Sequence, residues 1–186
     1  MMTSLATLPD RITAQTRWQS PLGEMLLART PAGLAGVWFA GQKDHPGALD
    51  APEIDDDALL RSTIAELAAY FDGAPVAFTP HLDLHGTPFQ QAVWEALLSI
   101  RPGTTSSYAA VARAVGSPNA VRAVGAAVGK NPVSVIVPCH RVIGSGGALT
   151  GYAGGLDRKR TLLKLEGFRI EGANPSTTVA PNHALA

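Results

Sequence analysis

A single cysteine, Cys139, is the residue of this chain best suited to nucleophilic chemistry. It lies in the run Pro138-Cys139-His140-Arg141-Val142, directly after the apolar residues 133–137. Proline fixes its own φ angle and restricts the residue before it, so we expect Cys139 at a fixed bend behind a buried, extended segment. A free thiol has a pKa of about 8.5, and nearby cations lower it and favour the reactive thiolate. The pattern therefore predicts a positioned thiol.

His140 and Arg141 adjoin this thiol in sequence, but adjacency alone does not establish reactivity. Successive side chains of an extended backbone point to opposite sides, so His140 would act on Cys139 through a water molecule or across a bend. The alternative is a buried and unreactive cysteine, which composition alone favours because free cysteines are often core residues. The local residues leave both interpretations open.

Four helices are predicted around this segment. The first begins with Thr87 as N-cap, Pro88 at its first position and Gln90 completing a capping box. The other three are expected over residues 107–115, 117–129 and 156–166. The second and third, joined by a turn at Gly116, resemble a helix-turn-helix, whose second helix enters a DNA groove. Taken alone this signal is weak, because alanine-rich helix pairs are common.

The first half of the chain reads as a mixture of strands and one helix. Residues 17–29 and 33–39 predict an antiparallel hairpin. An amphipathic helix follows from Leu59 to Phe71. We therefore predict an α/β module over residues 1–85, a second domain over 86–170, and a disordered tail over 171–186, where no periodicity is found.

Composition excludes several classes of protein. Apolar residues make up 46% of the 186 residues, yet no apolar run approaches the ~18 residues that span a bilayer. One cysteine excludes an internal disulfide and any zinc site with two thiolates. The start of the chain lacks the features of a secretory signal, so we expect a cytoplasmic location.

The net charge of zero conceals an asymmetry. Residues 1–85 contain 5 Lys/Arg and 11 Asp/Glu, a charge of −6, whereas residues 86–170 contain 10 and 3, a charge of +7. The second half is thus the better candidate for a polyanionic partner such as DNA, unless the distribution is a chance feature of the surface.

Several short motifs follow one another along residues 89–167. They are Ser107-Tyr108, Arg122-Ala123-Val124-Gly125, Asn131-Pro132, Pro138-Cys139-His140-Arg141-Val142-Ile143-Gly144, Gly151-Tyr152-Ala153-Gly154-Gly155 and Leu162-Leu163-Lys164-Leu165-Glu166-Gly167. In this order and spacing they resemble the alkyltransferase domain of the O6-alkylguanine-DNA alkyltransferases, or methylated-DNA–protein-cysteine methyltransferases. The resemblance implies a ribonuclease-H-like α/β module followed by a mainly helical, winged helix-turn-helix-like domain.

The resemblance implies that Cys139 takes an alkyl group from guanine O6, and also from O4-alkylthymine, in one in-line displacement. His140 would favour the thiolate through a water molecule, and Glu166 would orient its imidazole. Tyr108 would stabilise the departing guanine anion, and Asn131 would brace the turn before the cysteine. Because the product is a thioether that nothing in the sequence could remove, each molecule would act once, and no cofactor is implied.

The resemblance also implies that the damaged nucleotide is flipped out of duplex DNA. Arg122 would fill the gap from a helix whose small residues permit close approach to the minor groove. The implied DNA-contacting residues are Ser107, Arg122, Ala123 and Gly125, and the implied pocket residues are Val142, Tyr152, Ala153, Gly154 and Lys159. Some family members carry serine where Ala153 stands, which leaves the preference for bulky alkyl groups open.

Some relatives hold a structural zinc ion, but we predict no metal, because His45, His81 and His85 are few and scattered. Without the cysteine-rich sensor module of the family's regulators, a stand-alone, monomeric repair protein is expected. Two other classes of function remain, a non-catalytic DNA-binding protein and a cysteine hydrolase. The non-catalytic relatives in the family replace the cysteine, whereas this chain keeps it. A hydrolase would require an oxyanion hole and multiple turnover.

Overall fold

The computed structural model describes residue 8, residues 11–172 and residues 178–181. It divides into two compact units. One contains the described residues up to Gly41 together with His45–His85, and the other contains Gln42–Asp44 with the described residues from Gly86. The predicted N-terminal module included Gln42–Asp44, whereas these three residues pack with the second unit.

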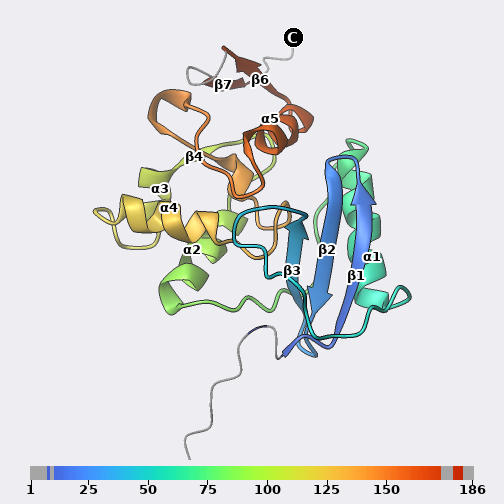
Figure 1. Cartoon of the computed structure of the whole chain (residues 1–186). Coiled ribbons are helices and arrows are strands. Elements are labelled where there is room, and N and C mark those ends of the chain that lie inside the picture. Colours follow the sequence, from blue (N-terminus) through green and yellow to red (C-terminus); the bar gives the residue numbers. More distant parts are fainter. Residues whose placement is uncertain (1–7, 9–10, 173–177, 182–186) are drawn as a thin grey trace, which may run out of the picture. The chain divides into compact units, whose positions relative to one another are not determined.

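The first unit is a three-stranded antiparallel sheet with one helix (Figure 1). Its strands are β1 (Ala14–Ser20), β2 (Gly23–Arg29) and β3 (Leu34–Phe39), in that spatial order. The predicted hairpin is confirmed between β2 and β3. Residues 17–29 form parts of two strands, because the chain turns between Ser20 and Gly23.

Helix α1 (Ala58–Phe71) contacts β1 and β2 and confirms the helix predicted from the spacing of apolar residues. Asp57 caps it by accepting hydrogen bonds from the N–H groups of Leu59 and Leu60. Such a cap satisfies donors that have no partner within the helix. The helix buries a stripe consisting of Leu60, Thr63, Leu67, Tyr70 and Phe71.

The second unit is built around four helices: α2 (Pro88–Leu98), α3 (Tyr108–Ala114), α4 (Val121–Gly129) and α5 (Leu156–Leu165). The capping box predicted at Thr87 and Gln90 is present. α3 and α4 pack side by side, and both contact α2 (Figure 1). The indole N–H of Trp94 donates to the carbonyl of Ala127 at 2.8 Å, which ties α2 to α4 in the core.

Short strands complete this unit. β4 (Ser106–Ser107) pairs in parallel with β5 (Val142–Ile143), and β6 (Phe168–Glu171) pairs antiparallel with β7 (Thr178–Pro181). Residues 178–181 therefore do not belong to a disordered tail. A strand of only four residues leaves no recognisable pattern in the sequence. Val179 nevertheless packs against the buried cluster of Ile143, Leu149, Leu163 and Phe168. The rest of the tail beyond residue 172 lies outside the described residues.

Two predicted features near the cysteine are wrong. Helix α4 begins at Val121 and not at Ser117, because the N–H of Ala120 donates to the carbonyl of Ser117 and closes a separate turn. Residues 133–137 are a tight turn and not an extended segment, since the N–H of Val137 donates to the carbonyl of Val133 at 3.0 Å. Val135 adopts a φ of 74°, an unusual conformation for a β-branched residue.

Candidate active site

Cys139 opens the 3₁₀ turn η2 (Cys139–Arg141), directly after this tight turn. Asn131 holds the two together from the end of α4. Its side-chain amide donates to the carbonyl of Val137 at 2.8 Å and to the sulfur of Cys139 at 3.0 Å, while its carbonyl oxygen accepts from the N–H of Val133. A strained Val135 persists because its surroundings over-determine the backbone. Asn131 therefore positions the sulfur as well as the turn.

The thiol is the resting form of Cys139. Burial raises its pKa above the ordinary value, and the hydrogen bond from Asn131 and the nearby charge of Lys159 oppose this only in part. The residue is 4% exposed. A reaction that uses the thiolate therefore needs a base to remove the proton.

His140 has the protonation state that such a base requires, and Glu166 holds its ring. The side chain of His140 is fully buried, and its Nε2 lies 2.9 Å from Oε1 of Glu166. Burial lowers the pKa of His140 despite this hydrogen bond, so the ring is neutral near pH 7. A neutral ring that donates from Nε2 to a carboxylate carries its free lone pair on Nδ1. Nδ1 is buried and has no hydrogen-bond partner among the described residues, so it is available to accept a proton.

Arg141 completes this cluster, and sequence reasoning did not give it a role. Its Nε and NH2 groups donate to the carboxylate of Glu166 at distances of 2.7 to 3.1 Å, and its NH1 donates to the carbonyl of Ile100. Burial raises the pKa of Glu166, but the hydrogen bonds from His140 and Arg141 outweigh it and lower the pKa to about 2. Glu166 is therefore a carboxylate at any pH at which the protein works. In the sequence, the sign of this role was that Arg141 directly follows His140.

Lys159 is a buried cation that organises the pocket wall. From α5 it donates to three backbone carbonyls, those of Val142, Thr150 and Gly151, at 2.5, 2.6 and 3.0 Å. Burial lowers its pKa to about 8. Its hydrogen bonds hold the glycine-containing loop after β5 against the turn that carries Cys139, so its role here is structural and electrostatic.

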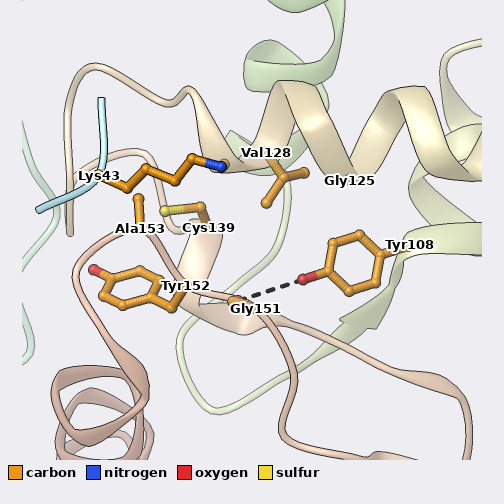
Figure 2. A pocket seen from close by; sticks show the side chains of 9 residues that line it. Lys43, Tyr108, Gly125, Val128, Cys139, Gly151, Tyr152 and Ala153 are labelled. Atoms are coloured by element: carbon orange, nitrogen blue, oxygen red, sulfur yellow. Dashed lines mark hydrogen bonds between the residues drawn. The ribbon is translucent and has the colours of Figure 1, made fainter. Parts of the chain in front are cut away.

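A pocket of about 300 Å³ opens over the sulfur of Cys139. It is lined by Lys43, Tyr108, Gly125, Val128, Gly129, Cys139, Gly151, Tyr152 and Ala153. Figure 2 shows Tyr108 on one side of the pocket and Lys43, Tyr152 and Ala153 on the other, with Cys139 between them. The hydroxyl of Tyr108 donates to the carbonyl of Gly151 at 3.5 Å. Burial raises the pKa of Tyr108, although a hydrogen bond with Thr150 opposes the shift, so the phenol keeps its proton at neutral pH.

The predicted site residues fall into distinct places. Tyr108, Gly125, Cys139, Tyr152 and Ala153 line the pocket together. Asn131, His140, Glu166 and Lys159 lie behind its wall, where they contact Cys139, one another or the loop. Val142 is fully buried and Gly154 gives its carbonyl to Arg158, so neither lines the pocket as the structure stands. Lys43, Val128 and Gly129 also line the pocket, although no sequence pattern indicated them.

The residues implied in DNA contact lie around α3 and α4. Arg122 and Ala123 are exposed on α4. Gly125 lies on the same helix, where an added Cβ would stand 3.8 Å from the ring of Tyr108. Ser107 caps α3 by accepting a hydrogen bond from the N–H of Ala110. The helix pair thus presents a basic side chain beside small residues, close in the fold to the pocket that contains Cys139.

The described residues contain neither a metal-binding cluster nor a membrane-spanning helix. No group of three or more His, Cys, Asp or Glu side chains that could hold a metal ion is found there. None of the described helices is long and apolar enough to cross a membrane.

Comparison with known families identifies both units. Residues 88–168 match the family described as "6-O-methylguanine DNA methyltransferase, DNA binding domain", and residues 15–84 match "6-O-methylguanine DNA methyltransferase, ribonuclease-like domain". The second match extends the resemblance, which rested on motifs within residues 89–167, to the N-terminal unit. The predicted fold class is confirmed for both.

Individual relatives agree. A methylated-DNA–protein-cysteine methyltransferase of Mycobacterium tuberculosis is 46% identical over 150 residues, covering 81% of this chain and 90% of that protein. One of Methanosarcina acetivorans is 45% identical over 152 residues, covering 81% and 96%. The solved structure of Mycobacterium tuberculosis OGT in complex with DNA is 44% identical, with a TM-score of 0.76 over 83% of this chain and 92% of that one.

Proposed function

Because this chain belongs to the family of methylated-DNA–protein-cysteine methyltransferases, we propose that it transfers methyl and other alkyl groups from guanine O6 in duplex DNA to Cys139. One observation carries the assignment of residues. The cysteine sulfur lies in the pocket, while the histidine next to it is buried, held by a carboxylate and left with a free Nδ1. These are the nucleophile, the base and the group that orients the base.

The first step is removal of the thiol proton. His140 accepts it at Nδ1 through a water molecule, and Glu166 stabilises the imidazolium that forms. The carboxylate does not take up the proton itself, because its pKa is about 2. Lys159 favours the thiolate by its charge, and Asn131 does so by its hydrogen bond to the sulfur.

The second step is an in-line displacement. A sulfur–carbon bond forms as the carbon–O6 bond breaks, and the electron pair of that bond remains on guanine. Tyr108 lies on the side of the pocket opposite Tyr152 and Ala153, and its protonated hydroxyl stabilises the guanine anion until a proton reaches the base. The product is a thioether, which no described residue is placed to hydrolyse, so each molecule reacts once.

The helix pair α3–α4 delivers the base to the pocket. A base stacked in duplex DNA cannot reach the buried sulfur, so the nucleotide must be flipped out, at a cost of a few kcal/mol. We propose that exposed Arg122 occupies the vacated space and that Ser107, Ala123 and Gly125 lie along the DNA backbone. The charge of +7 on residues 86–170 supports binding to the phosphates. We propose further that the protein acts as a monomer and accepts O4-alkylthymine through the same pocket.

The experiment that tests this function is incubation with duplex DNA containing O6-methylguanine, followed by measurement of the intact protein mass. We expect one added methyl group per molecule, mapped to Cys139 by peptide analysis, and none in Cys139→Ser. The variant should retain DNA binding, because the sulfur is not part of the α3–α4 surface.

The same experiment separates the two alternative classes. A DNA-binding protein without catalysis would show no added mass in the wild type. A cysteine hydrolase would release product repeatedly and return to its unmodified mass, and this would refute the single-use mechanism.

A further inference from the structure

Lys43 enters the pocket from a part of the chain remote in sequence from the motifs. It lines the same pocket as Cys139, Tyr152 and Ala153. Figure 2 shows its side chain extending across the pocket on the side where these residues lie, whereas Tyr108 lies on the opposite side. It is the one lining residue of the described chain with a charged side chain.

The backbone at Lys43 is held by several independent contacts. Its N–H donates to the carbonyl of Ala153 at 2.9 Å. Ser134 lies in the tight turn before Cys139. Its hydroxyl donates to the side chain of buried Gln42 at 3.2 Å. Gly41 and Asp44 have φ angles of 72° and 59°, so the chain bends sharply on both sides of Gln42 and Lys43. Hydrogen bonds and two bends thus hold the backbone that carries Lys43 in a defined position at the pocket.

The proposed mechanism directs the alkyl group to this side of the pocket. During displacement the transferred carbon lies on the sulfur of Cys139, with guanine O6 opposite to it. With the base against Tyr108, the rest of the alkyl group extends toward Ala153, Tyr152 and Lys43. An ammonium group on this side meets the substituent of the alkyl group.

We propose that Lys43 is a specificity-determining residue that favours O6-alkyl groups carrying a carboxylate, such as carboxymethyl. The inference rests on the proposed alkyl transfer. A carboxylate brings negative charge close to a sulfur that reacts as a thiolate, and such repulsion is weakly screened in a pocket. Lys43 offsets it. The other charged groups nearby are already engaged, Lys159 with three carbonyls and Glu166 with His140 and Arg141.

Transfer of a carboxymethyl group follows the same steps as transfer of a methyl group. The bond between the sulfur of Cys139 and the methylene carbon forms, the bond between that carbon and O6 breaks, and guanine leaves with the electron pair and then takes up a proton. The product is S-carboxymethylcysteine. Lys43 neither gains nor loses a proton in this step, so it is not a catalytic acid or base.

The test compares three duplex substrates that contain O6-methylguanine, O6-carboxymethylguanine or the neutral O6-carbamoylmethylguanine. The last has nearly the shape of carboxymethyl without its charge. Transfer rates are measured for the wild type, Lys43→Met, Lys43→Arg and a matched control, Lys164→Met, which removes an exposed lysine of α5 outside the pocket. The ratio of carboxymethyl to carbamoylmethyl transfer should fall about fivefold in Lys43→Met. It should persist in Lys43→Arg and in the control.

An unchanged ratio in Lys43→Met overturns the proposal. Equal slowing on all three substrates gives that unchanged ratio, and would assign Lys43 to the DNA backbone. Transfer of methyl by the wild type, measured in the same series, keeps the proposed function standing even if the ratio does not change. Absence of any transfer by the wild type overturns both.

Discussion

Replacing Glu166 by glutamine should lower the free energy of unfolding of the second unit by about 3 kcal/mol at pH 7. The side chain of Glu166 is 3% exposed and accepts hydrogen bonds from His140 and Arg141. Its pKa falls from 4.5 to about 2 on folding. A difference of about 2.5 pH units, at about 1.36 kcal/mol for each, amounts to about 3.4 kcal/mol. Glutamine keeps the shape but leaves the buried guanidinium of Arg141 without its counter-charge.

The pH dependence has a definite sign. Because the folded-state pKa of Glu166 lies below the unfolded value, the unfolded state binds more protons between about pH 2 and pH 4.5. This stabilisation is therefore complete above pH 4.5 and is lost as the pH falls through about 2. At pH 3 about 1.4 kcal/mol of it should remain. His140 adds to the pH dependence, because burial lowers its pKa while Glu166 raises it, so acid destabilises the variant through His140 more than it destabilises the wild type. The two proteins are therefore compared at pH 7.

Amide hydrogen exchange of peptides covering α2 and α5 measures the opening of the second unit separately from the first. The matched control is Glu171→Gln, which removes an exposed carboxylate paired with Arg169 and should cost less than about 0.5 kcal/mol. A loss below about 1 kcal/mol for Glu166→Gln at pH 7 would refute the reasoning.

Two further substitutions separate the DNA-handling and chemical roles. Arg122→Ala should slow transfer from a methylated duplex at least tenfold more than reaction with the free base O6-benzylguanine, because a flipped nucleotide needs a filler and a free base does not; equal losses in the two rate assays would contradict that role. Tyr108→Phe should slow transfer from both substrates by about tenfold through loss of one donor to the guanine anion, while the rate of Cys139 alkylation by iodoacetamide stays the same; a comparable drop in the iodoacetamide rate would instead show that Tyr108 acts on the thiol.

The helices of this protein could be predicted from sequence because their ends carry local signals. Thr87, Pro88 and Gln90 specify the start of α2, and Gly167 follows α5 with a φ of 85°. The predicted start of α4 was wrong. Ser117 and Pro118 are residue types that favour the N-cap and the first position of a helix, but here they form a turn that ends before the helix begins. Local sequence does not distinguish these two uses of the same residues.

The turn before Cys139 could not be foreseen, since four of the five residues 133–137 are β-branched and apolar and favour an extended strand. Its conformation depends on Asn131, which bonds to residues two, six and eight positions further along the chain. The sequence motifs did indicate the group around Cys139, His140 and Glu166. They gave no indication of Lys43, because a contact between a loop in the first half of the chain and the motif Gly151-Tyr152-Ala153 has no periodicity or spacing to reveal it.

The hydrogen bonds of Lys159 have a consequence for how this pocket can change. The ammonium binds the carbonyls of Val142, Thr150 and Gly151, and every residue has a carbonyl. These three hydrogen bonds therefore do not depend on which side chains the loop bears, while the side chains that line the pocket decide what it accepts. Mutations at residues such as Ala153 can accumulate without loosening the wall. An anchor made to the main chain alone thus lets the selectivity of the pocket evolve, and a library of substitutions at Ala153 and its neighbours is a practical route to new alkyl specificities.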